Sequence, residues 1–147
     1  MVKIEILTGI DQAGADRLNE LMSQLCPDCP AHPLTHFRDI LYHPTTRLMV
    51  ATDGEKINGC LTLVWYKIPS LTRFWIEDLV VDQLFRGQGI GKALILKAIE
   101  LAQALGGQYI DLTSRPSRIE ANQLYQSLGF EKRETNVYRF RLHGTSK

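Results

Sequence analysis

The feature that most limits the fold is a glycine-rich stretch that reads Arg86-Gly87-Gln88-Gly89-Ile90-Gly91-Lys92. It follows an apolar, β-branched run ending near Val81 and continues directly into an amphipathic pattern over residues 90–105. This order predicts a strand, a tight loop and a helix, in which glycines permit positive φ and close approach of a ligand. The first amides of a helix have no internal partners, and the helix dipole favours negative charge there. We therefore expect a diphosphate to bind at the amides of residues 88–92.

Two well-known phosphate loops do not fit this stretch. A P-loop aligned on Gly91-Lys92 would place Arg86 at its first glycine and Ala93 at its hydroxyl residue. The dinucleotide fingerprint fails as well, because its third glycine falls on Lys92 or on Leu94, depending on the frame. The sequence thus argues against both of these nucleotide-binding classes.

The stretch resembles the phosphate loop of the GNAT superfamily of N-acetyltransferases, whose pattern [QR]-x-x-G-x-[GA] is met by Arg86, Gly89 and Gly91. A second block, residues 122–130, also resembles that family, and the spacing between the two blocks is similar to the family's. Together they cover roughly the second half of the chain. The resemblance implies acetyl-CoA as the acetyl donor and an amine as the acceptor.

Hydrophobic periodicity predicts the element order β-α-α-β-β-β-α-β-α-β, an α+β fold with helices flanking a mixed sheet. The predicted strands are residues 2–7, 48–52, 57–67, 73–81, 109–113 and 137–142. This is also the order of the GNAT fold, an α/β/α arrangement with a mostly antiparallel central sheet. The resemblance implies that strands 73–81 and 109–113 splay apart, and that the pantetheine arm of acetyl-CoA enters the gap.

Acetyl transfer to an amine requires a proton for the leaving thiolate, and Tyr125 suits that role. Its phenol, whose ordinary pKa is about 10, is protonated at neutral pH. Asn122 lies three residues earlier, so both side chains project from one helix face. The resemblance places the tyrosine beside the CoA sulfur and the asparagine against the pantetheine. The alternative is that Tyr125 only packs, with its hydroxyl bonded to the backbone.

Removal of a proton from the amine requires a base, and Glu77 and Asp78 are the candidates. Two adjacent carboxylates are out of character for a core strand, and alternation would put them on opposite faces. The resemblance favours Glu77, acting directly or through water. For Asp78, an ion pair or solvent exposure is an equally good reading. A backbone amide of residues 79–81 would donate to the oxyanion of the intermediate.

The residues expected to contact acetyl-CoA are Leu79, Val80, Val81, Arg86, Gly87, Gln88, Gly89, Ile90, Gly91, Lys92, Asn122 and Tyr125. Arg86 either adds a charge-assisted contact to the phosphates or braces the loop. Lys92 either serves the phosphates or is a solvated surface lysine.

Length and composition fit one soluble domain over residues 1–147, with 44% apolar and 22% charged residues. The net charge of +1 gives no global field for nucleic acid or a membrane surface. The first residues do not read as a signal peptide, and no segment approaches the length of a membrane span. Three cysteines, an odd number, argue against a disulfide framework. We expect a cytoplasmic protein.

Four metal-binding residue types lie close together at Cys26, Cys29, His32 and His36. The run is tighter than zinc-finger spacing, so a structural loop between two helices is the preferred reading, and we expect no metal. In the GNAT fold this loop borders the acceptor pocket, which implies that His32, His36 and Phe37 contact substrate.

The sequence therefore predicts an N-acetyltransferase acting on a small soluble primary amine by direct attack in a ternary complex. The segment 76–81 also resembles the matching strand of glucosamine-6-phosphate N-acetyltransferases, although no sugar-phosphate motif accompanies it. Peptide or protein amines are rival acceptors, and a CoA-binding module without turnover is the alternative of a different class. The sequence leaves monomer and homodimer open.

Overall fold

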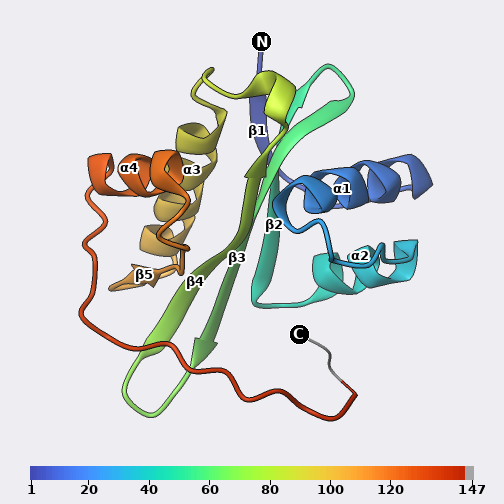
Figure 1. Ribbon diagram of the computed structural model, residues 1–147. Coiled ribbons are helices and arrows are strands. Elements are labelled where there is room, and N and C mark those ends of the chain that lie inside the picture. Colours follow the sequence, from blue (N-terminus) through green and yellow to red (C-terminus); the bar gives the residue numbers. More distant parts are fainter. Residues whose placement is uncertain (145–147) are drawn as a thin grey trace. The chain divides into compact units, whose positions relative to one another are not determined.

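A computed structural model describes residues 1–144 and shows two compact units, Met1–Thr113 and a second that begins at Ser114 (Figure 1). The strands of the first unit are β1 (Lys3–Ile6), β2 (Thr46–Asp53), β3 (Lys56–Lys67), β4 (Thr72–Val81) and β5 (Ile110–Asp111). Its helices are α1 (Gln12–Leu25), α2 (Leu34–Tyr42), α3 (Ile90–Ala104) and the short 3-10 helix η1 (Gln83–Phe85).

The sheet has the order β1-β2-β3-β4-β5, and its neighbours are antiparallel except for the parallel pair β4–β5. Local turn chemistry explains the antiparallel part. Asp53 pairs with Lys56 across Gly54, whose φ is 69°, so a tight hairpin turn joins β2 to β3. A second tight turn, closed by mutual backbone hydrogen bonds of Ile68 and Leu71, joins β3 to β4.

Helices cover both faces of this sheet: α1 and α2 lie on one side and α3 on the other (Figure 1). Asp11 caps α1, since its Oδ1 accepts the Gly14 N–H at 2.8 Å. The α1/α2 side buries one cluster of side chains: Ala15, Leu18, Leu21, Phe37, Leu48, Val50, Ile57, Cys60 and Val80. The expected fold class, a mostly antiparallel sheet flanked by helices, is confirmed.

The second unit contains α4 (Ile119–Ser127), which ends before Gly129 at a φ of 96°. Arg118 is the N-cap residue, and no side chain caps the helix. The expected strand 137–142 is wrong. Its large apolar side chains are 72–87% exposed, and a strand forms only where a neighbouring strand satisfies its backbone groups.

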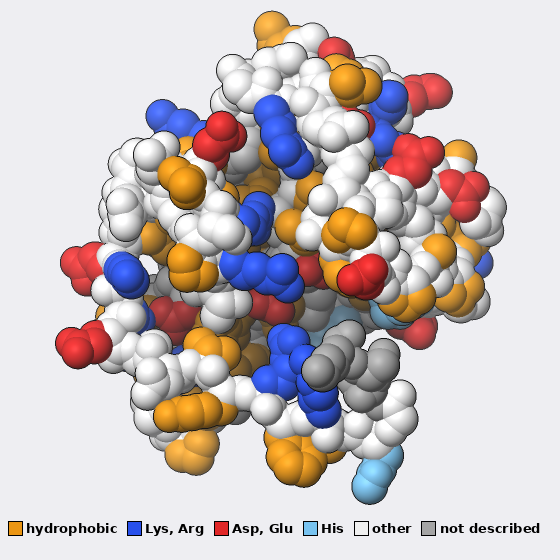
Figure 2. All heavy atoms as spheres, in the orientation of Figure 1, with side chains coloured by type: hydrophobic (Ala, Val, Ile, Leu, Met, Phe, Trp, Pro, Cys, Tyr) orange, Lys and Arg blue, Asp and Glu red, His pale blue; other side chains and the backbone are white. Residues whose placement is uncertain are grey.

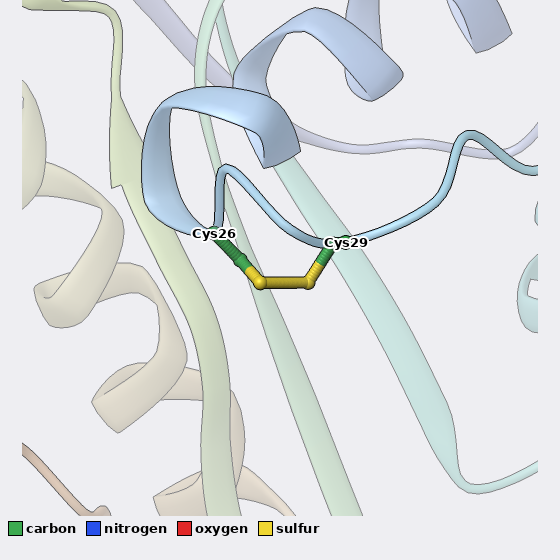
Figure 3. Close-up of a disulfide and its surroundings, with 2 residues drawn as sticks. All are labelled: Cys26 and Cys29. Carbon is green, nitrogen blue, oxygen red and sulfur yellow. A yellow bond between two sulfur atoms is a disulfide. The ribbon is translucent and has the colours of Figure 1, made fainter. Parts of the chain in front are cut away.

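A disulfide joins Cys26, the C-cap residue of α1, to Cys29 in the loop that follows (Figure 3). The odd number of cysteines argued against a disulfide framework, and this one local disulfide was not predicted from the sequence. The Cys29 N–H also donates to the Cys26 carbonyl, so the backbone turn alone holds the two residues close. Cys60, the remaining cysteine, is free and buried.

Side chains of both charges are interspersed with apolar ones over the face drawn in Figure 2, in keeping with the net charge of +1. Within residues 1–144, no helix combines the length and apolarity needed to cross a membrane.

Candidate active site

The glycine loop leaves the start of α3 open. Gly87 and Gly89 have φ of 79° and 80°, and nothing lies within 4 Å of where their Cβ atoms would be. Gly89 is the N-cap residue of α3, and no side chain caps this end of the helix. The amides of the first turn therefore have neither intrahelical nor capping partners, the state in which a helix N-terminus binds an anion.

A buried ion pair between Arg17 of α1 and Asp82 anchors the beginning of this loop. Asp82 is only 3% exposed, and its Oδ1 accepts the Leu84 N–H at 2.9 Å to cap η1. Arg17 also donates from Nε to the Ile57 carbonyl at 2.7 Å. The hydrogen bond from Arg17, followed by that from Leu84, holds the pKa of the Asp82 carboxyl below its usual value. Sequence reasoning missed this pair, since only the fold brings Arg17 to the end of β4.

The two cations of the loop differ in their surroundings. Arg86 donates from Nε to the Val81 carbonyl at 3.2 Å, so it braces the loop against the end of β4. Lys92 lies in the first turn of α3, and its side chain is exposed. The structure thus favours the bracing role for Arg86, while the Lys92 ammonium group is open to solvent.

A bulge interrupts β4 directly before the loop. Thr62 pairs with Glu77 and Cys60 pairs with Val80, so Asp78 and Leu79 together face a single residue of β3. Asp78 is the only non-glycine residue with positive φ, 50°, among residues 1–144. A bulge leaves a backbone N–H without its ladder partner and turns it away from the neighbouring strand. The simple alternation expected for Glu77 and Asp78 therefore does not hold at this point.

The parallel pair β4–β5 is short. Only Phe74–Ile110 and Trp75–Asp111 are in register, and the predicted strand 109–113 is reduced to two residues. Beyond Trp75, the rest of β4 continues without a β5 partner. The expected separation of these strands is therefore present from Ile76 onward.

Glu77 lies beside this separation and lines a cavity of about 370 Å³ together with Val64, Tyr66, Trp75 and Thr113. Partial desolvation and then the negative charge of Asp78 raise the pKa of the Glu77 carboxyl. A carboxylate whose pKa moves toward neutrality is better matched to accept a proton from an ammonium group. The aromatic lining of the cavity was missed in the sequence, although the alternation of Trp75 with Glu77 was the available signal.

In the second unit, the two predicted residues of α4 have partners of their own. Asn122 donates from Nδ2 to the Arg115 carbonyl at 3.0 Å, which ties α4 to the turn that precedes it. Tyr125 is buried, and its ring lies 6.0 Å from that of Phe130. Burial raises the pKa of the Tyr125 phenol, with Arg118 acting in the opposite direction. The phenol is therefore protonated at neutral pH and able to donate.

The loop between α1 and α2 is tied to α1 by reciprocal hydrogen bonds between His32 and Asn19, of 3.0 and 2.9 Å. The His32 and His36 rings stack with centroids 4.0 Å apart, and Phe37 belongs to the core. Within residues 1–144, the histidines and the disulfide-bonded cysteines form no group of metal ligands.

Comparison with known proteins places this site in context. Residues 15–130 match the model of the acetyltransferase (GNAT) family. N-acetyltransferase 8B of Homo sapiens is 36% identical over 85 residues, which cover 56% of this chain and 37% of that protein. For the first relatives found, including an uncharacterised N-acetyltransferase of Methanocaldococcus jannaschii, the matched part covers 26–37% of their own length.

Solved structures share the fold along nearly the whole chain. An aminoglycoside acetyltransferase from an uncultured soil metagenomic sample superposes with a TM-score of 0.84 at 23% identity, covering 96% of this chain and 95% of that one. The aminoglycoside N-acetyltransferase AAC(6')-Iy, solved in complex with CoA, gives a TM-score of 0.79 at 20% identity, covering 96% and 95%. At these identities the likeness concerns the fold.

Proposed function

The chain belongs to the acetyltransferase (GNAT) family, and from this premise we propose that it transfers the acetyl group of acetyl-CoA to a primary amine. The acceptor is a small soluble molecule, and the amine attacks the thioester directly while both substrates are bound. The strongest support is three features that follow one another along residues 77–89: Glu77 with a raised pKa, the bulge at Asp78, and the open helix start at Gly89. In the proposed reaction these three features act, in the same order, as the base, the oxyanion donor and the diphosphate site.

The donor binds through its diphosphate at the amides of residues 88–92. The positive φ of Gly87 and Gly89 turns the loop amides toward the anion, and the open space at both glycines allows the phosphates close approach. Arg86 and Asp82 hold the loop in this shape through their bonds to the Val81 carbonyl and the Leu84 amide. Lys92, whose side chain is exposed in the first turn of α3, adds positive charge near the phosphates.

The nitrogen, which enters as an ammonium group, must lose two protons in the reaction, and the leaving thiolate must gain one. The amine enters as an ammonium group, Glu77 takes its proton, and the nitrogen lone pair attacks the thioester carbonyl carbon. A C–N bond forms, and the oxyanion accepts a hydrogen bond from the amide that the bulge frees, within residues 79–81. The attacking nitrogen loses its second proton to water, the oxyanion re-forms the carbonyl, and the C–S bond breaks. The thiolate takes the phenolic proton of Tyr125, which regains a proton from solvent, and Glu77 releases its proton to solvent. The products are the acetamide and free CoA.

The test is a panel of primary amines assayed for thiol release from acetyl-CoA. Tyr125→Phe should lower kcat by about 10²- to 10⁴-fold while the affinity for acetyl-CoA changes little, because only a transition-state interaction is removed. Gly89→Val should abolish donor binding, since a β-branched residue resists positive φ.

The outcomes separate the rival functions. Amine-dependent thiol release supports acetyl transfer to a small amine. Release only with peptides points to a peptide acceptor. Tight binding of acetyl-CoA with no stimulation by any amine would instead identify a CoA-binding module without turnover. Full kcat in Tyr125→Phe would reassign the acid.

A further inference from the structure

The cavity next to Glu77 has a lining that restricts which amines fit. Its walls are Val64 and Tyr66 of β3 and Trp75 and Glu77 of β4, with Thr113 beyond β5. Val64 faces Trp75 directly in the β3–β4 register. Side chains two residues apart point to the same side of a sheet, so these four form one continuous patch on the α1/α2 side.

The aromatic part of the patch is held in place. The Trp75 Nε1–H donates to the Tyr66 hydroxyl at 3.0 Å, which fixes the indole ring and uses its one polar group. Arg73, the next residue on this face, places its guanidinium 5.8 Å from the Trp75 ring and pairs with Asp111 at 3.4 Å. Its charge is directed to Asp111 and does not line the cavity.

The charge in the cavity is a single carboxylate, that of Glu77, and Thr113 and Tyr66 supply its hydroxyl groups. The cavity volume of about 370 Å³ lies at the small end of the range for ligand pockets. For an acceptor with several ammonium groups, the cavity offers a single carboxylate, that of Glu77, as an ionic partner. An acceptor rich in hydroxyls would bury them against Val64 and the Trp75 ring without hydrogen bonds, which is unfavourable.

We propose that the acceptor is a small monoamine carried on an apolar body, aliphatic or aromatic, with its ammonium group at Glu77 and its body against Trp75 and Val64. This inference rests on the proposed function for the identity of the site as the acceptor pocket. The indole face adds a cation–π attraction for the ammonium group. Polyhydroxylated amino sugars and polyamines are excluded as good acceptors.

The experiment compares two amines of equal carbon number and charge, n-hexylamine and 6-amino-1-hexanol, and includes 2-phenylethylamine, glucosamine and spermidine as further acceptors. Calorimetry measures their binding to the full chain in the presence of CoA, and thiol release from acetyl-CoA measures kcat/KM. We expect n-hexylamine to bind about tenfold more tightly than 6-amino-1-hexanol, because the added hydroxyl lacks a partner. 2-Phenylethylamine should exceed glucosamine and spermidine by at least that factor.

Matched variants test whether the preference for n-hexylamine over 6-amino-1-hexanol comes from the cavity. Trp75→Gln should reduce the n-hexylamine preference to within about twofold. Trp65→Gln makes the same change on the opposite face, where the ring stacks on Phe74, and should preserve the preference. Val64→Thr, a nearly isosteric change, should weaken the n-hexylamine preference as well. It replaces Trp75→Gln in the test if that variant does not fold.

The binding measurements test the apolar acceptor pocket, and the thiol-release measurements test the acetyltransferase activity. The expected binding preference without thiol release would overturn the acetyltransferase proposal and support the apolar pocket. Thiol release with equal or better binding of the hydroxylated or polycationic amines would overturn the apolar pocket and leave the transferase in place. The apolar pocket would also be overturned if no amine bound, or if Trp65→Gln alone lost the preference for n-hexylamine over 6-amino-1-hexanol.

Discussion

At the scale of single residues, Glu77 and Asp78 show how neighbours with the same charge acquire different roles. Glu77 continues the regular pairing of β4 and lines the cavity, whereas Asp78 adopts a φ of 50° in the bulge. Aspartate tolerates this region better than most residues. Partial desolvation and then the negative charge of Asp78 raise the pKa of the Glu77 carboxyl.

Replacement of Glu77 by Gln should therefore separate activity from stability. We expect kcat/KM to fall by about 10²- to 10⁴-fold near neutral pH. The folded pKa of Glu77 lies above its unfolded value, so ionisation of this group lowers the stability of the wild type as pH rises through the interval between the two values. Glu77→Gln lacks this loss, and above that interval its free energy of unfolding should equal or exceed that of the wild type. Denaturant unfolding and initial rates measure both.

Asp78→Asn is the matched control, since asparagine also tolerates positive φ. It should retain more activity than Glu77→Gln, and removal of its charge should shift the acidic limb of the pH–rate profile to lower pH. A greater activity loss in Asp78→Asn, at unchanged stability, would assign the base to the bulge residue.

The cysteines provide a second residue-scale prediction. Cys60 is 1% exposed, and burial followed by the charge of Asp78 raises its thiol pKa to about 12. After reduction with a dithiol, a thiol reagent should label two cysteines in the native protein, Cys26 and Cys29, and the third only after unfolding. Cys60→Ala should lower the unfolded count by one and leave the native count unchanged. Rapid labelling of three thiols in the native wild type would contradict this burial.

At the scale of elements, the position of α3 depends on the small size of Gly59. A Cβ at this position would lie 3.1 Å from the Val80 carbonyl oxygen and 3.2 Å from Ile90 Cγ2. Ile90 is the first residue of α3. The distance between β3 and this helix therefore controls where the amides that we propose as the diphosphate site lie.

Gly59→Ala should thus affect stability and donor binding together. We expect a loss of about 1–3 kcal/mol in the free energy of unfolding, because the core has no space for the methyl group. The affinity for acetyl-CoA, measured by calorimetry, should fall as Ile90 is displaced. Gly9→Ala is the control, since nothing lies within 4 Å of that Cβ. Unchanged affinity in Gly59→Ala would show that α3 adjusts without moving its first turn.

The ion pair between Arg17 and Asp82 connects α1 to the loop, and its loss should be costly. Arg17→Leu leaves a buried carboxylate unpaired, for which about 3 kcal/mol is expected near neutral pH. Since the pKa of Asp82 is lowered in the fold, its contribution is present above about pH 4 and is lost as pH falls through the folded value. The stability difference between wild type and Asp82→Asn should accordingly shrink in acid. A difference independent of pH would exclude the ion pair as its source.

Local patterns explain which elements were predictable from the sequence. Strands β2 and β3 are joined by a two-residue turn, and α3 follows directly from its glycine loop, so neighbouring residues specify these elements. The bulge at Asp78 was not predictable, because it arises where two residues of β4 face one residue of β3, and this depends on the pairing of two separate segments. The segment 137–142 alternates as a strand would, but alternation does not supply a pairing partner.

At the scale of the whole molecule, ligand binding should be visible as added stability. A ligand that binds only the folded chain stabilises it by about 2.7 kcal/mol at a hundredfold excess over Kd. Acetyl-CoA should produce such a shift in thermal unfolding, whereas ATP and NAD should produce much less, because the loop fits neither of their motifs. A shift with NAD equal to that with acetyl-CoA would remove the basis for the donor assignment. The single domain over residues 1–147 stays a prediction, and one cooperative transition would support it.

The bulge in β4 has a genetic consequence. Deletion of the one codon for Asp78 would leave equal numbers of residues between the pairs Thr62–Glu77 and Cys60–Val80. The shortened strand would complete its ladder and lose its only positive φ, so the deletion would relieve strain rather than disrupt folding. It would also remove the freed amide that we propose as the oxyanion donor. In a lineage no longer selected for the reaction, a single in-frame deletion would therefore be enough to produce a stable but inactive protein.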